Sequence, residues 1–135
     1  MRVVDGVADV DDIDAFLARL DEVAADHGVT VQAFDARYVV GRDHLERAVE
    51  LADRAIARGE NVARERGVEI LLYAAGRRQI DDALTMGVRE GRTPTVVVVS
   101  DAESDETAVA AAASAVGGLL DPAATLDDYD ADRVR

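Results

Sequence analysis

The chain has 135 residues, of which 49% are hydrophobic and 32% are charged. This length and composition predict one folded domain with its own core and exclude an intrinsically disordered chain. The absence of cysteine and the presence of only two histidines exclude disulfides, cysteine nucleophiles and histidine-rich metal cages. We find neither an apolar run long enough to cross a bilayer nor a signal peptide, so we expect a cytoplasmic protein without membrane contact.

The chain is strongly acidic, and its charged residues are unevenly distributed. All 15 basic residues are arginines, and with 28 acids they give a net charge of −13. Acidity without lysine is typical of proteins from salt-rich cytoplasms, so we expect a halophilic source, and the acidity alone does not exclude RNA binding. Residues 37–92 nevertheless contain eleven arginines against ten acids. This near-neutral stretch indicates either a surface that must not repel its partner or ion pairs that balance along one long helix.

The first half of the chain predicts alternating strands and helices. An Asp5-Gly6 turn is expected to end the first strand, and Gly28 and Gly59 are expected to follow helix ends. The first helix has an apolar stripe that includes Leu17 and Leu20. The expected elements are a strand at 2–4, a helix at 11–27, a strand at 29–34, a short extended segment at 38–40 and a helix from 41 to about 58.

The second half predicts more helix. Asn61 can cap the start of a short helix, whereas the apolar run at 68–75 fits either a strand or the start of a helix. Four consecutive valines at 96–99 predict a strand that is buried on both faces. The expected elements are a helix from 61, the ambiguous run at 68–75, a helix at 79–86, a strand at 95–99 and a helix at 103–116.

This pattern predicts the α/β (α+β) class, with a small mixed or antiparallel sheet covered by several helices in a single domain at 1–128. Residues 129–135 begin with acids, as the first turn of a helix does. We expect them to form either a disordered tail or the start of a truncated helix.

Motifs of catalysis are missing. The sequence contains neither the phosphate loop of nucleotide-binding proteins nor the Gly-x-Ser-x-Gly turn of hydrolases. The lack of lysine excludes Schiff-base chemistry. We therefore expect a protein that is not an enzyme and that uses no cofactor or metal.

The segment at 37–45 has the sequence RYVVGRDHL. His44 lies at the start of the following helix, on or beside its apolar stripe. Two interpretations remain open. His44 either lies at the edge of the core with a backbone carbonyl as its partner, or faces a binding partner from the helix N-terminus.

The segment at 69–80 has the sequence EILLYAAGRRQI. Its apolar run ends in small residues before Arg77, Arg78 and Gln79 open the next helix. Two arginine forks beside a helix N-terminus suit phosphate, and a glutamine can read the edge of a base. The alternative is a turn with two solvated arginines.

These two segments, together with Ala48 and Asn61, resemble the small kinase-binding subunits of the KEOPS complex, the family of the PRPK-binding protein TPRKB. The resemblance covers residues 1 to about 128. KEOPS transfers a threonylcarbamoyl group to an adenosine beside the anticodon of certain tRNAs. The resemblance implies a non-catalytic subunit that binds the atypical kinase-ATPase and the single-stranded 3′ CCA end of tRNA, and not DNA.

The motifs and the resemblance together give two groups of candidate residues. The tRNA-binding group is Arg37, Tyr38, His44, Asn61, Gly76, Arg77, Arg78 and Gln79. The apolar residues of the short helix at 79–86 cannot all face inward, so some are expected to contact the kinase. The kinase-facing group is Ile80, Ala83, Leu84 and Met86.

Two other functions remain open from the sequence. One is a small enzyme acting on an anionic metabolite, with Arg77 and Arg78 as an anion clamp and His44 as the base. That function requires a concave pocket joining these residues. The other is a homodimeric regulatory domain that binds a small ligand.

Overall fold

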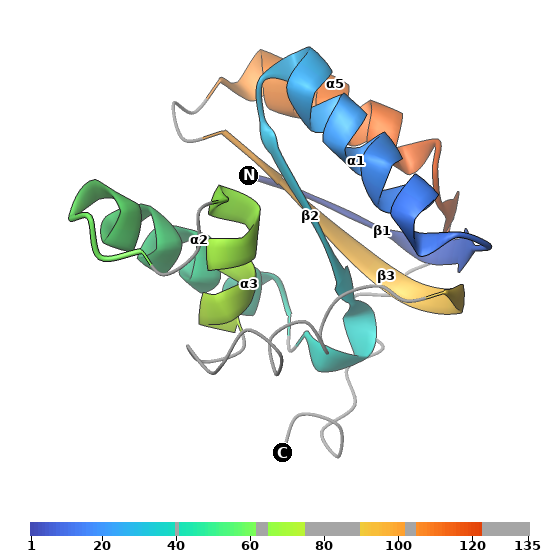
Figure 1. Cartoon of the computed structure of the whole chain (residues 1–135), viewed down its shortest axis with the longest axis horizontal. Coiled ribbons are helices and arrows are strands. Elements are labelled where there is room, and N and C mark those ends of the chain that lie inside the picture. The colour runs from blue at the N-terminus through green and yellow to red at the C-terminus, as the bar shows by residue number, and fades with distance from the viewer. Residues whose placement is uncertain (40, 62–64, 75–89, 102–104, 123–135) are drawn as a thin grey trace.

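The fold is an antiparallel sheet between two layers of helices (Figure 1). It is described here from a computed structural model, which defines residues 1–39, 41–61, 65–74, 90–101 and 105–122. In chain order, the elements are β1 (Arg2–Val10), α1 (Ile13–His27), β2 (Thr30–Asp35), the 3-10 turn η1 (Ala36–Tyr38), α2 (Arg42–Ala57), α3 (Arg66–Ala74), β3 (Gly91–Ser100), α5 (Glu106–Gly117) and β4 (Asp121–Pro122).

The sheet has the strand order β2-β3-β1-β4, and each neighbouring pair is antiparallel. The two long strands β1 and β3 pair over their whole length, from Arg2 opposite Val99 to Val10 opposite Gly91. The short strand β4 pairs with the middle of β1. This sheet and its helices confirm the predicted α+β class. The predicted domain boundary at 128 lies outside the described residues.

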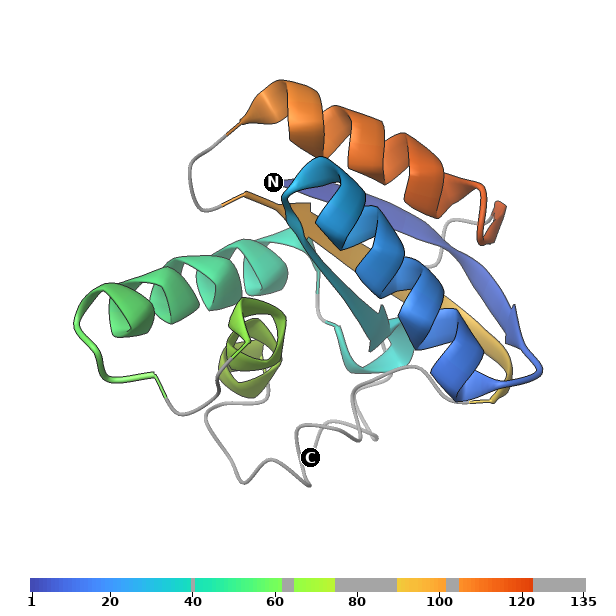
Figure 2. The ribbon, with the colours of Figure 1, turned by 45° about the horizontal axis from the view of Figure 1, so that its top comes forward.

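The four valines at 96–99 of β3 are buried on both faces of the sheet, as predicted. Side chains alternate along a strand, so Val96 and Val98 enter the core beneath α2 and α3. Val97 and Val99 enter the second core, beneath α1 and α5. Each face of the sheet therefore has its own helical layer and its own core (Figure 2).

The first helix begins and ends close to its predicted bounds. The Asp12 side chain accepts hydrogen bonds from two backbone amides of the first turn, and Gly28 ends the helix with φ of 65°. This left-handed conformation costs glycine little. Within the predicted apolar stripe, Leu20 is buried but Leu17 is 42% exposed. The inward orientation expected for Leu17 is wrong, because it lies on the side of α1 that faces away from the sheet.

The predicted end of the first strand at Asp5-Gly6 is wrong, because β1 continues to Val10. Gly6 allows a close approach between strands. A Cβ atom added there would lie 2.7 Å from the carbonyl oxygen of Asp121 and 2.9 Å from Cβ of Leu120. A glycine inside a strand often marks such an approach of neighbouring backbone.

The extended segment expected at 38–40 is wrong at Tyr38, because residues 36–38 form η1. The turn is favoured by Asp35, whose carboxylate accepts a hydrogen bond from the backbone amide of Arg37 at 3.0 Å. Short polar side chains often direct such turns. Val39 is extended, with φ of −104°, and residue 40 lies outside the described part.

Residues 68–74 of the ambiguous run at 68–75 belong to a helix, α3 (Arg66–Ala74), and residue 75 lies outside the described part. α3 begins at Arg66. The separate short helix expected from Asn61 falls on residues 62–64, which lie outside the described part. Gly67 of α3 lies beside Gln32 of β2, and a Cβ atom there would be 2.8 Å from Oε1 at the flexible end of that side chain. The local sequence pattern fits either a strand or a helix, and the packing of this segment against the sheet decides for the helix.

The other helices follow the sequence prediction in part. The bounds of α2 agree with the expected helix, and Gly59 beyond it has φ of 68°. The last helix, α5, starts at Glu106 with Asp105 as its cap. The helix expected at 79–86 and the tail at 129–135 lie outside the described residues. Within the part of the chain that is described, no helix is long and apolar enough to span a membrane.

Candidate partner-binding site

A hydrogen bond joins the two sequence segments that carry the predicted function. His44 lies in the first turn of α2, and Ala74 is the last described residue of α3. Nε2 of His44 is 2.8 Å from the carbonyl oxygen of Ala74. One residue of each segment, His44 and Ala74, therefore meets the other at the start of α2 and the last described residue of α3, although 30 residues separate the bonded pair.

The environment of His44 confirms the first of its two interpretations, a histidine at the edge of the core with a backbone carbonyl as its partner. The ring is partly buried. Because a carbonyl oxygen only accepts hydrogen bonds, Nε2 carries the proton and donates it. Nε2 is therefore engaged by Ala74, and in the neutral ring the lone pair that can accept a proton is on Nδ1.

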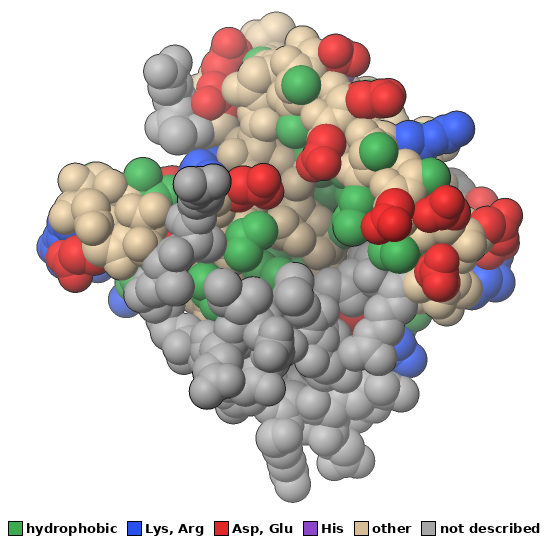
Figure 3. All heavy atoms as spheres, viewed as in Figure 1, with side chains coloured by type: hydrophobic (Ala, Val, Ile, Leu, Met, Phe, Trp, Pro, Cys, Tyr) green, Lys and Arg blue, Asp and Glu red, His purple; other side chains and the backbone are tan. Residues whose placement is uncertain are grey.

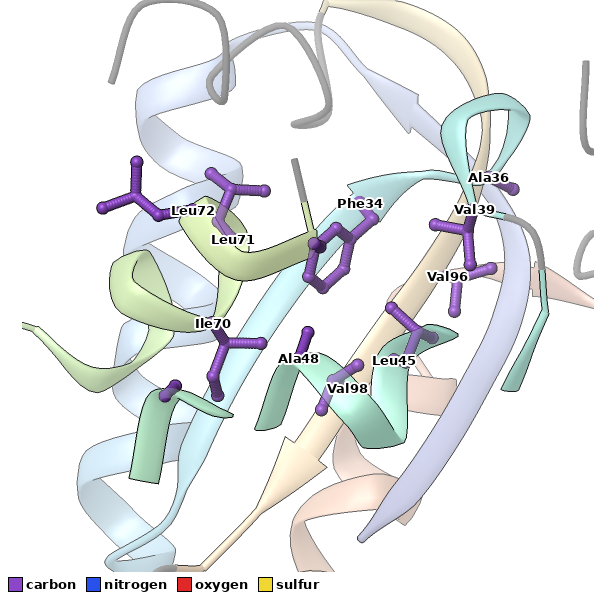
Figure 4. Close-up of a cluster of buried hydrophobic side chains, with 12 residues drawn as sticks. Phe34, Ala36, Val39, Leu45, Ala48, Ile70, Leu71, Leu72, Val96 and Val98 are labelled. Atoms are coloured by element: carbon purple, nitrogen blue, oxygen red, sulfur yellow. The ribbon is translucent and has the colours of Figure 1, made fainter. Parts of the chain in front are cut away.

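The helices behind this contact are held by the core on the α2 and α3 side of the sheet. Leu45 and Ala48 from α2 and Ile70 from α3 surround Phe34 of β2 (Figure 4). Leu45, Ile70 and Phe34 have no exposed surface, and Ala48 is 2% exposed. Ala48, which contributes to the family resemblance, is therefore a packing residue. The contact between His44 and Ala74 lies next to this closely packed core.

Arg37 is engaged by a buried carboxylate. Its Nε lies 2.9 Å from Oδ1 of Asp35, and its Nη2 lies 2.7 Å from Oδ2 of the same residue. Asp35 is 1% exposed, whereas the side chain of Arg37 is 33% exposed. Such a bidentate pair is strong and geometrically specific. Any phosphate contact by Arg37 must compete with this internal partner.

Asn61 is not brought together with His44. It is exposed and follows α2, whose axis rises by 1.5 Å per residue, so about 20 Å separate His44 from the C-terminal end of that helix. Tyr38 is in η1, but its side chain lies outside what the structure describes.

The remaining predicted site residues are also outside the described part. These are Gly76, Arg77, Arg78 and Gln79 for tRNA, and Ile80, Ala83, Leu84 and Met86 for the kinase.

Ion pairs between arginines and glutamates balance much of the charge along α2. Arg42 pairs with Glu46 at 2.9 Å, and Glu50 accepts both Arg47 at 3.1 Å and Arg54 at 2.7 Å. These exposed pairs support the interpretation that charges on one long helix balance one another. The neutral middle of the chain is therefore not in itself a sign of a partner.

Sequence reasoning missed the arginine that joins three elements of this half of the molecule. Arg66 of α3 binds both carboxylate oxygens of Asp53 in α2, at 2.7 and 2.9 Å. It also donates to the hydroxyl of Ser100 in β3 at 2.9 Å and to its carbonyl at 3.2 Å. No local pattern marks this group, because its members are 13 and 34 residues apart.

A pocket on the opposite face of the sheet contains none of the predicted site residues. It lies between the end of β1, the start of α1 and the end of α5, with Phe16, Leu119 and the acids at 9, 11 and 12 in its wall. Acidic side chains also gather over the nearby surface of α1 (Figure 3). A wall rich in carboxylates does not suit an anionic metabolite.

Comparison with known proteins supports the resemblance seen in the two motifs. The family model described as "Kinase binding protein CGI-121" matches residues 7–135, which is nearly the whole chain. No curated protein matches the sequence. The chain therefore belongs to the CGI-121 family of KEOPS-associated, kinase-binding accessory proteins.

Proposed function

We propose that this chain is a non-catalytic subunit of the KEOPS complex that makes threonylcarbamoyladenosine in tRNA, and that it binds both the atypical kinase-ATPase and the 3′ CCA end of tRNA. The observation that carries the proposal is the hydrogen bond from His44 to Ala74. It joins His44 of the first motif to Ala74 of the second, which supports a binding surface that the two motifs share.

The chemistry of the second motif suits an unpaired RNA end. Arg77 and Arg78 supply forks for phosphate, Gln79 can pair with a base edge, and Tyr38 can stack on a base. In concentrated salt, counterion release contributes little free energy. Binding therefore depends on stacking and direct hydrogen bonds, and its affinity should change little with salt.

The kinase contact is proposed for the apolar residues that follow, namely Ile80, Ala83, Leu84 and Met86. Apolar anchors that leave water on binding supply most of the affinity at protein interfaces. A carboxylate introduced among them would lose its hydration on binding without gaining a partner.

Two variants separate the two proposed contacts. Arg77→Glu with Arg78→Glu should lower tRNA affinity at least about tenfold, since hydrogen bonds to charged groups are worth about 1.5–3 kcal/mol each. Kinase affinity should be kept. Ala83→Glu should show the reverse pattern. The measurements are fluorescence anisotropy with a tRNA that has or lacks its CCA end, and kinase co-purification in molar KCl.

The matched control is Arg47→Glu with Arg54→Glu, which makes the same charge change on the exposed face of α2. It should bind tRNA almost normally if the motif arginines act locally. Equal affinity for tRNA with and without CCA would contradict the RNA half of the proposal. Loss of tRNA binding in the control would show that overall charge, and not the motif, governs binding.

A further inference from the structure

The pocket between β1, α1 and α5 has the chemistry of a docking site for another protein. We propose that it binds a basic segment of a partner protein, in which an arginine stands next to an apolar side chain. The pocket lies on the face of the sheet that α1 and α5 cover, opposite α2 and α3 (Figure 2). The inference therefore goes beyond the proposed function and does not rest on it.

The first argument is the shape of the pocket. Its volume is about 390 Å³, and its walls are the end of β1, the first two turns of α1 and the turn that follows α5. Pockets that bind ligands have volumes of roughly 300 to 1,000 Å³. The space is therefore large enough to receive one long side chain and part of its neighbour.

Hydrogen bonds hold the walls of the pocket in place. The carboxylate of Asp12 accepts from the backbone amides of Asp14 and Ala15 at 3.0 and 3.3 Å. In the turn after α5, the amide of Leu119 donates to the carbonyl of Val116 at 2.9 Å. The pocket is thus preformed, and a ligand loses less entropy there than in a site that it must first order.

The second argument is that apolar side chains line the pocket. Val10 is buried, whereas Phe16 and Leu119 are only partly covered by the core beneath them. A partner that covered Phe16 and Leu119 would remove apolar surface from water, which is a main source of affinity at interfaces. An aromatic ring such as that of Phe16 also packs favourably against the flat face of a guanidinium.

The third argument is the excess of carboxylates around these apolar residues. Asp9, Asp11 and Asp12 line the pocket together with one arginine, Arg19. Glu90 adds a carboxylate nearby, since its Oε2 lies 3.4 Å from the first backbone amide of α1. This excess favours a cationic partner and disfavours RNA, a phosphate or an anionic membrane surface.

Asp11 is the carboxylate of this group that a partner can pair with most readily. Asp12 caps α1, and Asp9 lies 3.5 Å from Arg92. Among the described residues, Asp11 takes part in no ion pair or side-chain hydrogen bond. A guanidinium can bind both oxygens of such a carboxylate, while its alkyl stem covers the apolar wall beside it.

Two matched pairs of variants test the pocket. Ala15 and Ala18 are both exposed residues of α1, but only Ala15 lines the pocket. Ala15→Arg fills the pocket with a positive side chain, and Ala18→Arg makes the same change outside it. Asp11→Asn removes a negative charge from the pocket, and Asp26→Asn removes one from the other end of α1.

The probe is a short blocked peptide that contains arginine next to leucine, added to the ¹⁵N-labelled full chain. The NMR signals of the Phe16 and Leu119 amides should shift in the wild type and in both control variants. Ala15→Arg should lower the affinity at least about tenfold, and Asp11→Asn about three- to tenfold. At about 1 M KCl, charges interact over only about 3 Å, so binding in the pocket should persist while loose attraction to the acidic surface disappears.

Two further peptides identify what the pocket recognises. Citrulline in place of arginine removes the charge, serine in place of leucine removes the apolar side chain, and each should bind about tenfold more weakly. Equal binding of the citrulline peptide, equal binding by Ala15→Arg, or no shift at about 1 M KCl overturns the proposal. Equal shifts with Mg²⁺ alone would overturn it in favour of a simple cation site. Self-association that Ala15→Arg abolishes would overturn it in favour of a second copy of this chain.

Discussion

Arg66 illustrates how one side chain can connect distant parts of this fold. Its guanidinium is bound by Asp53 on α2 and by Ser100 at the end of β3. The Arg66 side chain is only 13% exposed, whereas that of Asp53 is 40% exposed. Removing an arginine from such a pair leaves a carboxylate and a hydroxyl without their donor, which costs more than losing a surface ion pair.

We predict that Arg66→Met lowers the free energy of unfolding by about 2 kcal/mol, given that one partner is partly solvated. Arg54→Met is the control, because Arg54 and Glu50 are both at least half exposed. Its cost should stay below about 0.5 kcal/mol. Urea unfolding of both variants gives the comparison, and equal costs would contradict a structural role for Arg66.

At the scale of elements, the pairing of β1 with β4 depends on a glycine. The sequence suggests a turn at Gly6, but this residue lies within the continuous strand β1. The backbone of β4 approaches it very closely. A methyl group there meets backbone, which cannot rotate away as the end of a flexible side chain can. The connection from α5 into β4 is therefore sensitive to one added carbon atom.

We predict that Gly6→Ala lowers the free energy of unfolding by about 1–3 kcal/mol, the usual cost of overpacking. Gly117→Ala at the end of α5 is the control, because a Cβ atom there meets nothing within 4 Å. That change should be neutral or stabilise by up to about 1 kcal/mol. Thermal unfolding of both variants tests this, and a tolerated alanine at residue 6 would show that β4 can move aside.

At the scale of the whole molecule, the net charge of −13 opposes folding. Repulsion among distant carboxylates acts over about 10 Å at 0.1 M salt but only about 3 Å at 1 M. Ion pairs neutralise much of the described α2 surface, whereas α1 carries exposed acids without such pairing, including Asp21, Glu22 and Asp26. Salt should therefore act mainly on the α1 side.

We predict that the unfolding temperature rises as KCl increases from about 0.1 to about 1 M. A variant with Asp21→Asn, Glu22→Gln and Asp26→Asn should be more stable than the wild type at low salt, and the difference should shrink at high salt. The comparison cancels the general effect of salt on hydrophobic burial, which both proteins share. A salt response identical in the two proteins would exclude repulsion on α1 as its cause.

Local features of the sequence determined a large part of this fold. Asp12 and Gly28 bound the first helix because caps act on the nearest backbone groups. The valines at 96–99 predicted a strand buried on both faces because alternation requires apolar residues on each side. The two motifs were sufficient to indicate the family, which the match over residues 7–135 confirms.

The tertiary structure decided what depends on neighbours far along the chain. Residues 68–74 form part of a helix because they pack on β2 and α2, and Gly6 remains in a strand because β4 pairs beside it. The sequence left the role of His44 open, since its partner Ala74 is 30 residues away. Hydrogen-bond partners across such distances are set by how layers pack, and no local periodicity encodes them.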